Sequence, residues 1–228
     1  MKTPTMNVEA RLTEIDRGEA LRYLGIRGPL PADLETDLPR CEGMLREAAR
    51  PRAVWKLAEV LPGGILKGTS FRPEGETLRQ LTETCPRVIL MAATLGAETD
   101  ALIRRLQIRA MADSVLVDAL ANAAIENVCD NLCADLAAAL RPLHLSPRFS
   151  PGYGDFPLEQ QREVCAVLDV SRRIGVTLTP GNLMIPQKTV TALIGVSDEP
   201  LKNGPSGCES CRLAPHCSYR KEGQTCGR

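Results

Sequence analysis

The residues best suited to chemistry gather in one short stretch, 148–156, which reads RFSPGYGDF. Arg148 offers a planar guanidinium that binds a carboxylate through two hydrogen bonds. The Pro-Gly-Tyr-Gly turn that follows lets a ligand approach the backbone at Gly152, because no Cβ stands in the way. Tyr153 adds an aromatic face with a polar tip. This pattern predicts a cradle for a small zwitterion that carries a flat ring; the alternative is a tight turn in which Arg148 caps neighbouring carbonyls.

A second candidate is a row of polar residues within the segment 111–140, which is rich in alanine and leucine and contains no Lys or Arg. Asp118, Asn122, Glu126 and Asp130 recur every four residues, so a helix places them on one face. One interpretation is a solvated stripe on a half-buried helix. The other is an acidic wall that faces a cationic ligand or partner.

A third candidate is the C-terminal C-x2-C-x5-C-x8-C pattern formed by Cys208, Cys211, Cys217 and Cys226. Zinc ribbons usually hold two C-x2-C pairs farther apart, whereas iron–sulfur clusters accept compact, uneven spacing. Three interpretations of these metal-site candidates remain: an iron–sulfur cluster, a zinc ion or unliganded thiols. The five other cysteines stand mostly among apolar residues, which is typical of small buried side chains.

Common catalytic signatures are absent from the sequence: it has no Walker loop, no G-x-G-x-x-G, no H-E-x-x-H and no G-x-S-x-G. His144 and His216 are its only histidines, which disfavours a histidine-based triad. The Lys and Arg residues number 28, as do the Asp and Glu residues, and this balance gives no support for a nucleic-acid partner. Without an apolar run of membrane-spanning length or a signal-peptide core, we expect no membrane association and a cytoplasmic location.

The elements that must position these candidates are a mixture of helices and strands. Helical spacing predicts helices in 14–25, ending at Gly25, and in 31–50, where Pro39 should break or kink the helix. A strand is expected at 52–61, and 64–68 should pair with it as a hairpin. A second strand is expected at 86–96, in the centre of the sheet and buried on both faces. Further helices are predicted at 75–85, 97–110, 111–140 and 158–175, and strands within 176–197.

Since helices and strands do not alternate regularly, the sequence predicts an α+β fold with a curved mixed or antiparallel sheet flanked by helices, followed by a Cys-rich tail. We divide the chain into an N-terminal helical segment, 1–50, packed on a main ligand-binding domain, 51–197, with the tail at 198–228.

The segment RFSPGYGDFP resembles the Arg-x-x-x-Gly-Tyr-x-x-x-Pro signature of the activation domain of cobalamin-dependent methionine synthase, in its free-standing bacterial form. The similarity continues through LDVSRRIGVTLTPGNLMIPQKTVTALIG. It covers about residues 85–197, is weaker over 15–84, where LRYLG and RPRAVWKL carry it, and does not extend to the cysteine tail.

The resemblance implies that the chain binds S-adenosylmethionine in a shallow cleft and reactivates a cobalamin-dependent methyltransferase, as a component of a split methionine synthase. A flavodoxin or ferredoxin-type donor would reduce the partner's cob(II)alamin, and the sulfonium methyl would pass to cob(I)alamin. The partner is a cobalamin-binding methionine synthase or another corrinoid methyltransferase.

By the same resemblance, Arg148 would hold the methionyl carboxylate, and Phe149, Ser150, Gly152 and Tyr153 would shape the cleft. An acidic contact of the family falls at or near Asn122, so Glu126 is the expected partner of the ligand's ammonium. The family's late-strand tyrosine aligns with Ile194, a departure that bears on affinity. The departure and the cysteines support an alternative: a metal- or Fe-S-containing redox adaptor for another corrinoid protein that does not use S-adenosylmethionine.

Overall fold

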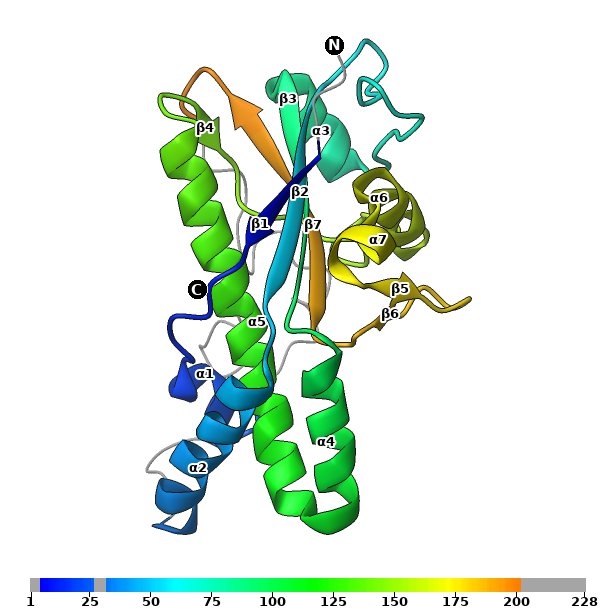
Figure 1. Cartoon of the computed structure of the whole chain (residues 1–228). Helices are drawn as coiled ribbons and strands as arrows, with labels where there is room; N and C mark the ends of the chain where they lie inside the picture. The colour runs from blue at the N-terminus through cyan, green and yellow to red at the C-terminus, as the bar shows by residue number, and fades with distance from the viewer. Residues whose placement is uncertain (1–4, 27–31, 202–228) are drawn as a thin grey trace.

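The computed structural model describes residues 5–26 and 32–201, and an antiparallel five-stranded sheet lies at their centre (Figure 1). Its strand order is β1-β2-β3-β7-β4, with bounds Met6–Glu9, Arg52–Glu59, Arg87–Thr94, Thr189–Ser197 and His144–Leu145. A two-stranded sheet, β5 (Thr177–Leu178) and β6 (Met184–Ile185), lies apart from it. The predicted α+β class with a curved antiparallel sheet is confirmed.

Helices cover both faces of this sheet. On one face lie α1 (Arg17–Tyr23), α2 (Ala32–Ala48), α4 (Ala97–Arg109) and α5 (Met111–Ala139), and they share a core with alternate residues of β3 and β7. The 3-10 turn η1 (Leu158–Gln160), α6 (Gln161–Leu168) and α7 (Val170–Ile174) cover the other face, and α3 (Glu76–Thr84) packs beside β7. Strand β3 is therefore buried on both faces, as predicted.

Helix α5 is the longest element and runs past the whole sheet (Figure 1). Its buried side contains as many alanines as leucines, and the four alanines are Ala119, Ala121, Ala123 and Ala124. Because alanine has the highest helix propensity and a small side chain, the same residues favour the helix and let it pack against the sheet. The opposite side of α5 is left to carry the polar row.

Two helices differ from their predictions. Helix α2 continues through Pro39 rather than breaking there, because Leu38, Cys41 and Leu45 on both sides of the proline are buried against the core. The single helix predicted for 158–175 is instead split at Asp169, which adopts a left-handed conformation with φ of 53°. The split allows the apolar residues of both α6 and α7 to pack on the sheet.

Smaller features complete the comparison with the predicted elements. Helix α1 ends at Tyr23, two residues before the predicted Gly25, and α7 ends at Ile174, directly before the predicted Gly175. Both glycines have positive φ. The hairpin expected after β2 is reduced to one bridge, Val60 to Leu66. Strand β1 was not predicted.

Among the cysteines outside the tail, only Cys133 is half-buried; the other four are buried, and all five are free thiols. The four tail cysteines of the predicted metal site lie outside the described residues. None of the helices in the described part of the chain combines the length and apolar character that a membrane crossing requires.

Candidate functional site

The 148–156 turn is anchored to the edge of the main sheet. Phe149 and Leu193 exchange backbone hydrogen bonds of 2.9 and 2.8 Å, and the backbone N–H of Ser146 donates to the carbonyl of Gly195 at 2.9 Å. The segment thus extends the pairing of β4 along β7 before it turns away. Because residues alternate between faces along such a segment, Phe149 faces the core beneath α6 whereas Arg148 faces α5.

The aromatic residues of the turn divide between core and surface. The rings of Phe149 and Phe156 are stacked with centroids 6.0 Å apart, and Phe156 is only 2% exposed. Tyr153 is 70% exposed. Gly152 and Gly154, with φ of 89° and 54°, form the bend that separates these roles. The two phenylalanines fix the position of the turn, and Tyr153 is the ring that remains available to a ligand or partner.

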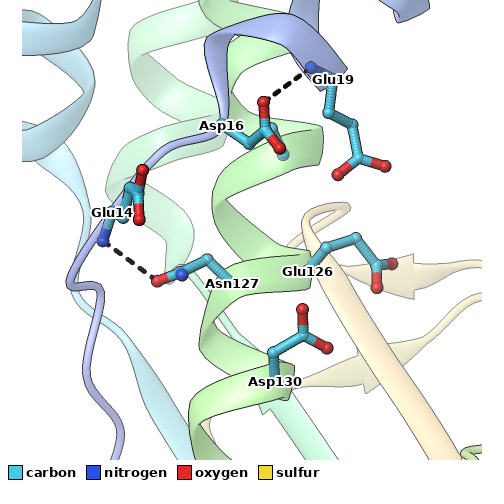
Figure 2. A pocket seen from close by; sticks show the side chains of 7 residues that line it. Glu14, Asp16, Glu19, Glu126, Asn127 and Asp130 are labelled. Carbon is cyan, nitrogen blue, oxygen red and sulfur yellow. Dashed lines mark hydrogen bonds between the residues drawn. The ribbon is translucent and has the colours of Figure 1, made fainter. Parts of the chain in front are cut away.

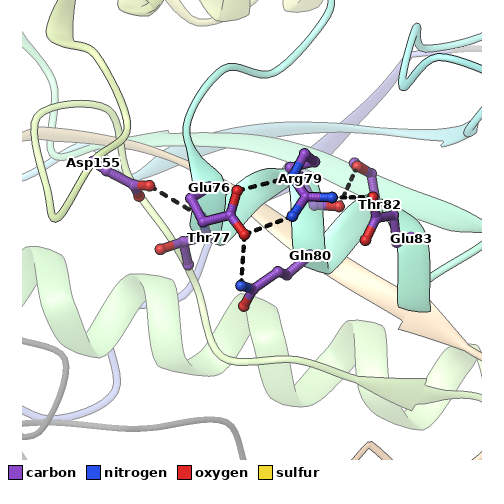
Figure 3. Close-up of polar contacts among 7 residues, drawn as sticks. All are labelled: Glu76, Thr77, Arg79, Gln80, Thr82, Glu83 and Asp155. Carbon is purple, nitrogen blue, oxygen red and sulfur yellow. Dashed lines mark hydrogen bonds and ion pairs between the residues drawn. The ribbon is translucent and has the colours of Figure 1, made fainter.

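The far end of the turn is held by α3 (Figure 3). The carboxylate of Asp155 accepts a 3.0 Å hydrogen bond from the backbone N–H of Thr77, in the first turn of α3. This contact suits the helix dipole as well as the unsatisfied N–H groups of a helix start. The backbone is close here too, since a Cβ on Gly75 would lie 2.6 Å from the carbonyl oxygen of Asp155.

Arg148 lies across the polar row of α5. Its Nη2 donates to Glu126 Oε2 and to Asp130 Oδ1, both at 2.9 Å, and its side chain is 21% exposed. The other terminal nitrogen, Nη1, is buried and finds no hydrogen-bonding partner among the described residues. The alternative expectation, that Arg148 caps neighbouring carbonyls, is therefore wrong. The thiols of Cys129 and Cys133 lie near the guanidinium, and burial raises the pKa of both, so they stay neutral.

Lys188 at the entry to β7 neutralises the other half of the row. Its ammonium contacts Asp118 Oδ1 at 2.8 Å and donates to Asn122 Oδ1 at 2.7 Å, while the lysine itself is almost buried. The row is thus neither an uncompensated acidic wall nor a wholly solvated stripe. Two basic residues from outside α5 each bridge one pair of its members.

A small cavity of about 80 Å³ opens beside Glu126 and Asp130, between α5 and the segment that leads into α1 (Figure 2). Glu14, Asp16 and Glu19 line its other wall. Its floor is formed by Ala123 and by Asn127, whose side-chain oxygen accepts hydrogen bonds from the backbone of residues 13 and 14. Five carboxylates surround this cavity, and three of them are paired with arginines: Glu126 and Asp130 with Arg148, and Glu19 with Arg22. The two arginines only partly compensate the five acids, so the cavity stays negative and favours a cation.

The electrostatic state of Glu126 reflects this crowding. Burial raises its pKa above the ordinary value, the positive charge of Arg148 opposes that rise, and the negative charges of Asp130 and Glu19 add to it. A carboxylate in this position holds its proton more readily than an exposed one. A bound cation would favour the ionised form.

The structure thus brings together only part of the predicted site. Arg148 and Glu126 are in direct contact, and Asn122 lies one helical turn away beside Lys188. Ser150, Gly152 and Tyr153 stay on the turn and do not line the cavity. Ile194, at 1% exposure, packs in the core beneath α5, so its side chain faces no surface ligand.

Sequence reasoning missed the acidic residues Glu14, Asp16 and Glu19. One local signal was available for Asp16, whose side chain accepts a 2.9 Å hydrogen bond from the backbone of Glu19 as the N-cap of α1. No local pattern indicates that this cap faces α5.

The chain matches no protein-family model and no curated protein sequence. Among solved structures, it is similar to the crystal structure of the MetH reactivation domain bound to AdoHcy, with a TM-score of 0.66 and 16% sequence identity. The match covers 98% of this chain and 87% of that one. At this identity the similarity establishes a shared fold.

Proposed function

We propose that the protein binds S-adenosylmethionine and serves as a free-standing reactivation module for a cobalamin-dependent methyltransferase, such as a split methionine synthase. The fold shared with a reactivation domain that was crystallised with AdoHcy is the observation that carries the proposal. AdoHcy is what S-adenosylmethionine becomes when it gives up its methyl group. The Arg-x-x-x-Gly-Tyr turn found in the sequence supports the same conclusion independently.

The charges of the site fit such a ligand. S-adenosylmethionine carries an ammonium, a sulfonium and a carboxylate, and the cavity beside Glu126 and Asp130 offers carboxylates to the cations. Arg148 offers Nη1, a donor without a partner among the described residues, to the ligand's carboxylate. We assign Tyr153 and the backbone at Ser150 and Gly152 to the border of the adenosyl group.

In this proposal the chain binds and orients the methyl donor, and a corrinoid held by the partner protein supplies the nucleophile. The sulfonium is a good leaving group, so the chain needs no acid–base residue of its own. The scarcity of histidine agrees with that requirement. A flavodoxin or ferredoxin-type protein is the proposed electron donor, and the cytoplasm is the proposed location.

Isothermal titration calorimetry with S-adenosylmethionine and with AdoHcy tests the proposal. Arg148→Met should weaken binding by about 10- to 100-fold, the effect of losing one hydrogen bond to a charged group. Arg172→Met is the matched control, because Arg172 is an exposed arginine on α7, on the opposite face of the sheet. The absence of binding heat with either ligand, alone and with the corrinoid partner present, would contradict the proposal.

The second candidate function, a redox adaptor that uses a metal or an iron–sulfur cluster, rests on the spacing of Cys208, Cys211, Cys217 and Cys226. Anaerobic purification of the full chain followed by iron, sulfide and zinc analysis tests it. This candidate predicts bound metal together with an Arg148→Met variant that remains fully active with its corrinoid partner. A colourless, metal-free protein would eliminate it.

A further inference from the structure

The corner where α4 meets α5 combines three features that no role described above explains. Only Ala110 separates the end of α4 at Arg109 from the start of α5 at Met111. The two helices form an antiparallel pair that projects beyond the sheet (Figure 1). The tip of this pair lies at the N-terminal end of α5, whereas Arg148 contacts the C-terminal half of that helix, although a groove beside the tip reaches Asn122, one helical turn before Glu126.

Apolar side chains are unusually exposed at this corner. Ile108 is 88% exposed and Met111 is 61% exposed, and Val115, one turn into α5, is exposed as well. Met111 and Val115 are four residues apart on α5 and so share one of its faces, and Ile108 lies at the end of α4. Single exposed apolar residues are ordinary, but a group of them on one feature marks an interaction site.

The groove begins beside these residues. Its volume is about 270 Å³, and it is lined from three helices: by Tyr23 at the end of α1, by Ile103 on α4, and by Met111, Val115, Asp118 and Asn122 on α5. The carboxylate of Asp118 is compensated by Lys188 at 2.8 Å. Both apolar and polar side chains contribute to the lining. A concave site of this kind suits the insertion of one large side chain from a partner.

Three arginines border the apolar residues on α4. Arg104, Arg105 and Arg109 are exposed, and within the described part of the chain none of them has a carboxylate partner. The two acids nearest in sequence are already engaged. Asp113 is paired with Arg40 through two hydrogen bonds of 2.7 Å, and Asp100 is buried and accepts a 2.8 Å hydrogen bond from the backbone N–H of Gln187. The corner is therefore locally positive in a chain whose formal net charge is zero.

We propose that this corner is the docking surface for a protein partner that presents an apolar side chain surrounded by carboxylates. The apolar side chain enters the groove, and the carboxylates pair with Arg104, Arg105 and Arg109. Arginine and methionine are enriched in protein interfaces, and unpaired charges at the rim select a complementary partner and speed its association.

Charge and shape favour an acidic protein partner over three other occupants: the chain's own tail, a second copy and a lipid surface. Residues 202–228 of the chain carry five Lys and Arg but only two Glu, so the tail has the same sign as the corner. A second copy docked by two-fold symmetry would bring arginines against arginines. A flat lipid surface would leave the groove unfilled.

A fluorescein-labelled acidic peptide with a central Phe-Leu is the probe, and fluorescence anisotropy at low salt is the measurement. We expect binding to the full chain that weakens at least tenfold in the Arg105→Glu/Arg109→Glu double variant. Arg172→Glu, at an exposed arginine on α7, is the matched control and should leave binding unchanged. Equal binding of a peptide with lysines in place of the acids would overturn the proposal.

A second variant keeps the test valid if the double variant fails to fold. Circular dichroism checks the folding of each protein. Ile108→Ser changes a side chain that is almost fully exposed, so it should preserve the fold and still weaken peptide binding. Co-sedimentation with vesicles of phosphatidylglycerol and sedimentation velocity of the chain alone cover the other occupants. Vesicle binding or self-association that the double variant abolishes, with peptide binding unaffected, would replace the protein partner by a membrane or by a second copy.

Discussion

Arg148 and Glu126, 22 positions apart in the chain, are joined by a 2.9 Å hydrogen bond between guanidinium and carboxylate. The resemblance seen in the sequence implies that these residues bind opposite charges of one ligand, yet in the structure they bind each other. In the proposed function a zwitterionic ligand would have to replace this contact: its ammonium would take Glu126 and its carboxylate would take Arg148. Binding of such a ligand should therefore depend on the balance of charge around α5.

The raised pKa of Glu126 leads to a prediction on stability. Because the folded protein holds this proton more tightly than the unfolded chain, stability should fall as pH rises from about the ordinary value of 4.5 through the raised pKa. Glu126→Gln removes this loss, so the variant should gain stability relative to wild type over that interval. Urea unfolding between pH 4 and 7 measures the difference.

Glu59→Gln is the control for this prediction, because Lys67 lowers the pKa of Glu59 by hydrogen bonding to it. Its stability relative to wild type should change with the opposite sign, improving as pH falls from about 4.5 through the lowered pKa, so the control series extends to about pH 3. A pH-independent difference for Glu126→Gln would show that the residue titrates alike in the folded and unfolded states.

The almost buried Lys188 should contribute more to stability than a lysine in a surface ion pair. Lys188→Ala leaves Asp118 and Asn122 without their partner and should cost about 1–3 kcal/mol in the free energy of unfolding. Lys67→Ala, which breaks an exposed pair with Glu59, should cost less than Lys188→Ala, because solvent screens the pair. Equal costs in chemical unfolding would contradict the role given to Lys188.

The aromatic residues of the turn should separate stability from binding. Phe156→Ala removes a buried, stacked ring and should destabilise the protein by about 3–5 kcal/mol. Tyr153→Ala should change stability by no more than about 0.5 kcal/mol because the side chain is exposed. If Tyr153 borders the adenosyl group, the same variant weakens S-adenosylmethionine binding in calorimetry; unchanged affinity would remove it from the site.

The contact between α3 and the turn is tested at Gly75. Alanine there has an unfavourable φ of 108° and a Cβ 2.6 Å from the backbone oxygen of Asp155, so Gly75→Ala should cost about 1–3 kcal/mol and shift the turn. Gly43→Ala, within α2 and without a near neighbour, should instead stabilise by roughly 0.5–1 kcal/mol. Thermal unfolding that ranks the two variants the other way would refute this packing.

Elements with a strong local pattern could be predicted from the sequence. The continuous apolar run of β3 predicts a strand, and the alanine-rich sequence of α5 predicts a helix, without reference to any other segment. Strand β1 could not be found this way, because it is four residues long, mostly exposed, and defined by pairing with β2 more than forty residues later. The break at Asp169 was equally hidden, since a non-glycine residue adopts the left-handed conformation only under tertiary constraint.

The candidate site likewise contains features that the sequence predicts and features that it does not. Arg148 and the acidic periodicity of α5 are visible in the sequence, because each belongs to one continuous segment. Lys188 and Arg148 each bind two members of the row. These contacts depend on packing across the sheet, so no single segment of the sequence reveals them. The contribution of Glu14, Asp16 and Glu19 to the same cavity likewise depends on α1 docking on α5, over a hundred residues away.

The polar row of α5 also makes the site sensitive to insertions in this helix, because an inserted residue rotates one part of the row relative to the other. An α-helix turns by about 100° per residue, so inserting one alanine after Asn122 would rotate Glu126 and Asp130 away from Arg148 while Asp118 stayed beside Lys188. The buried alanines that follow would tolerate that rotation no better. We therefore expect that α5 does not accommodate insertions or deletions, and that relatives of this chain keep the distance between its two cation-bridged pairs constant.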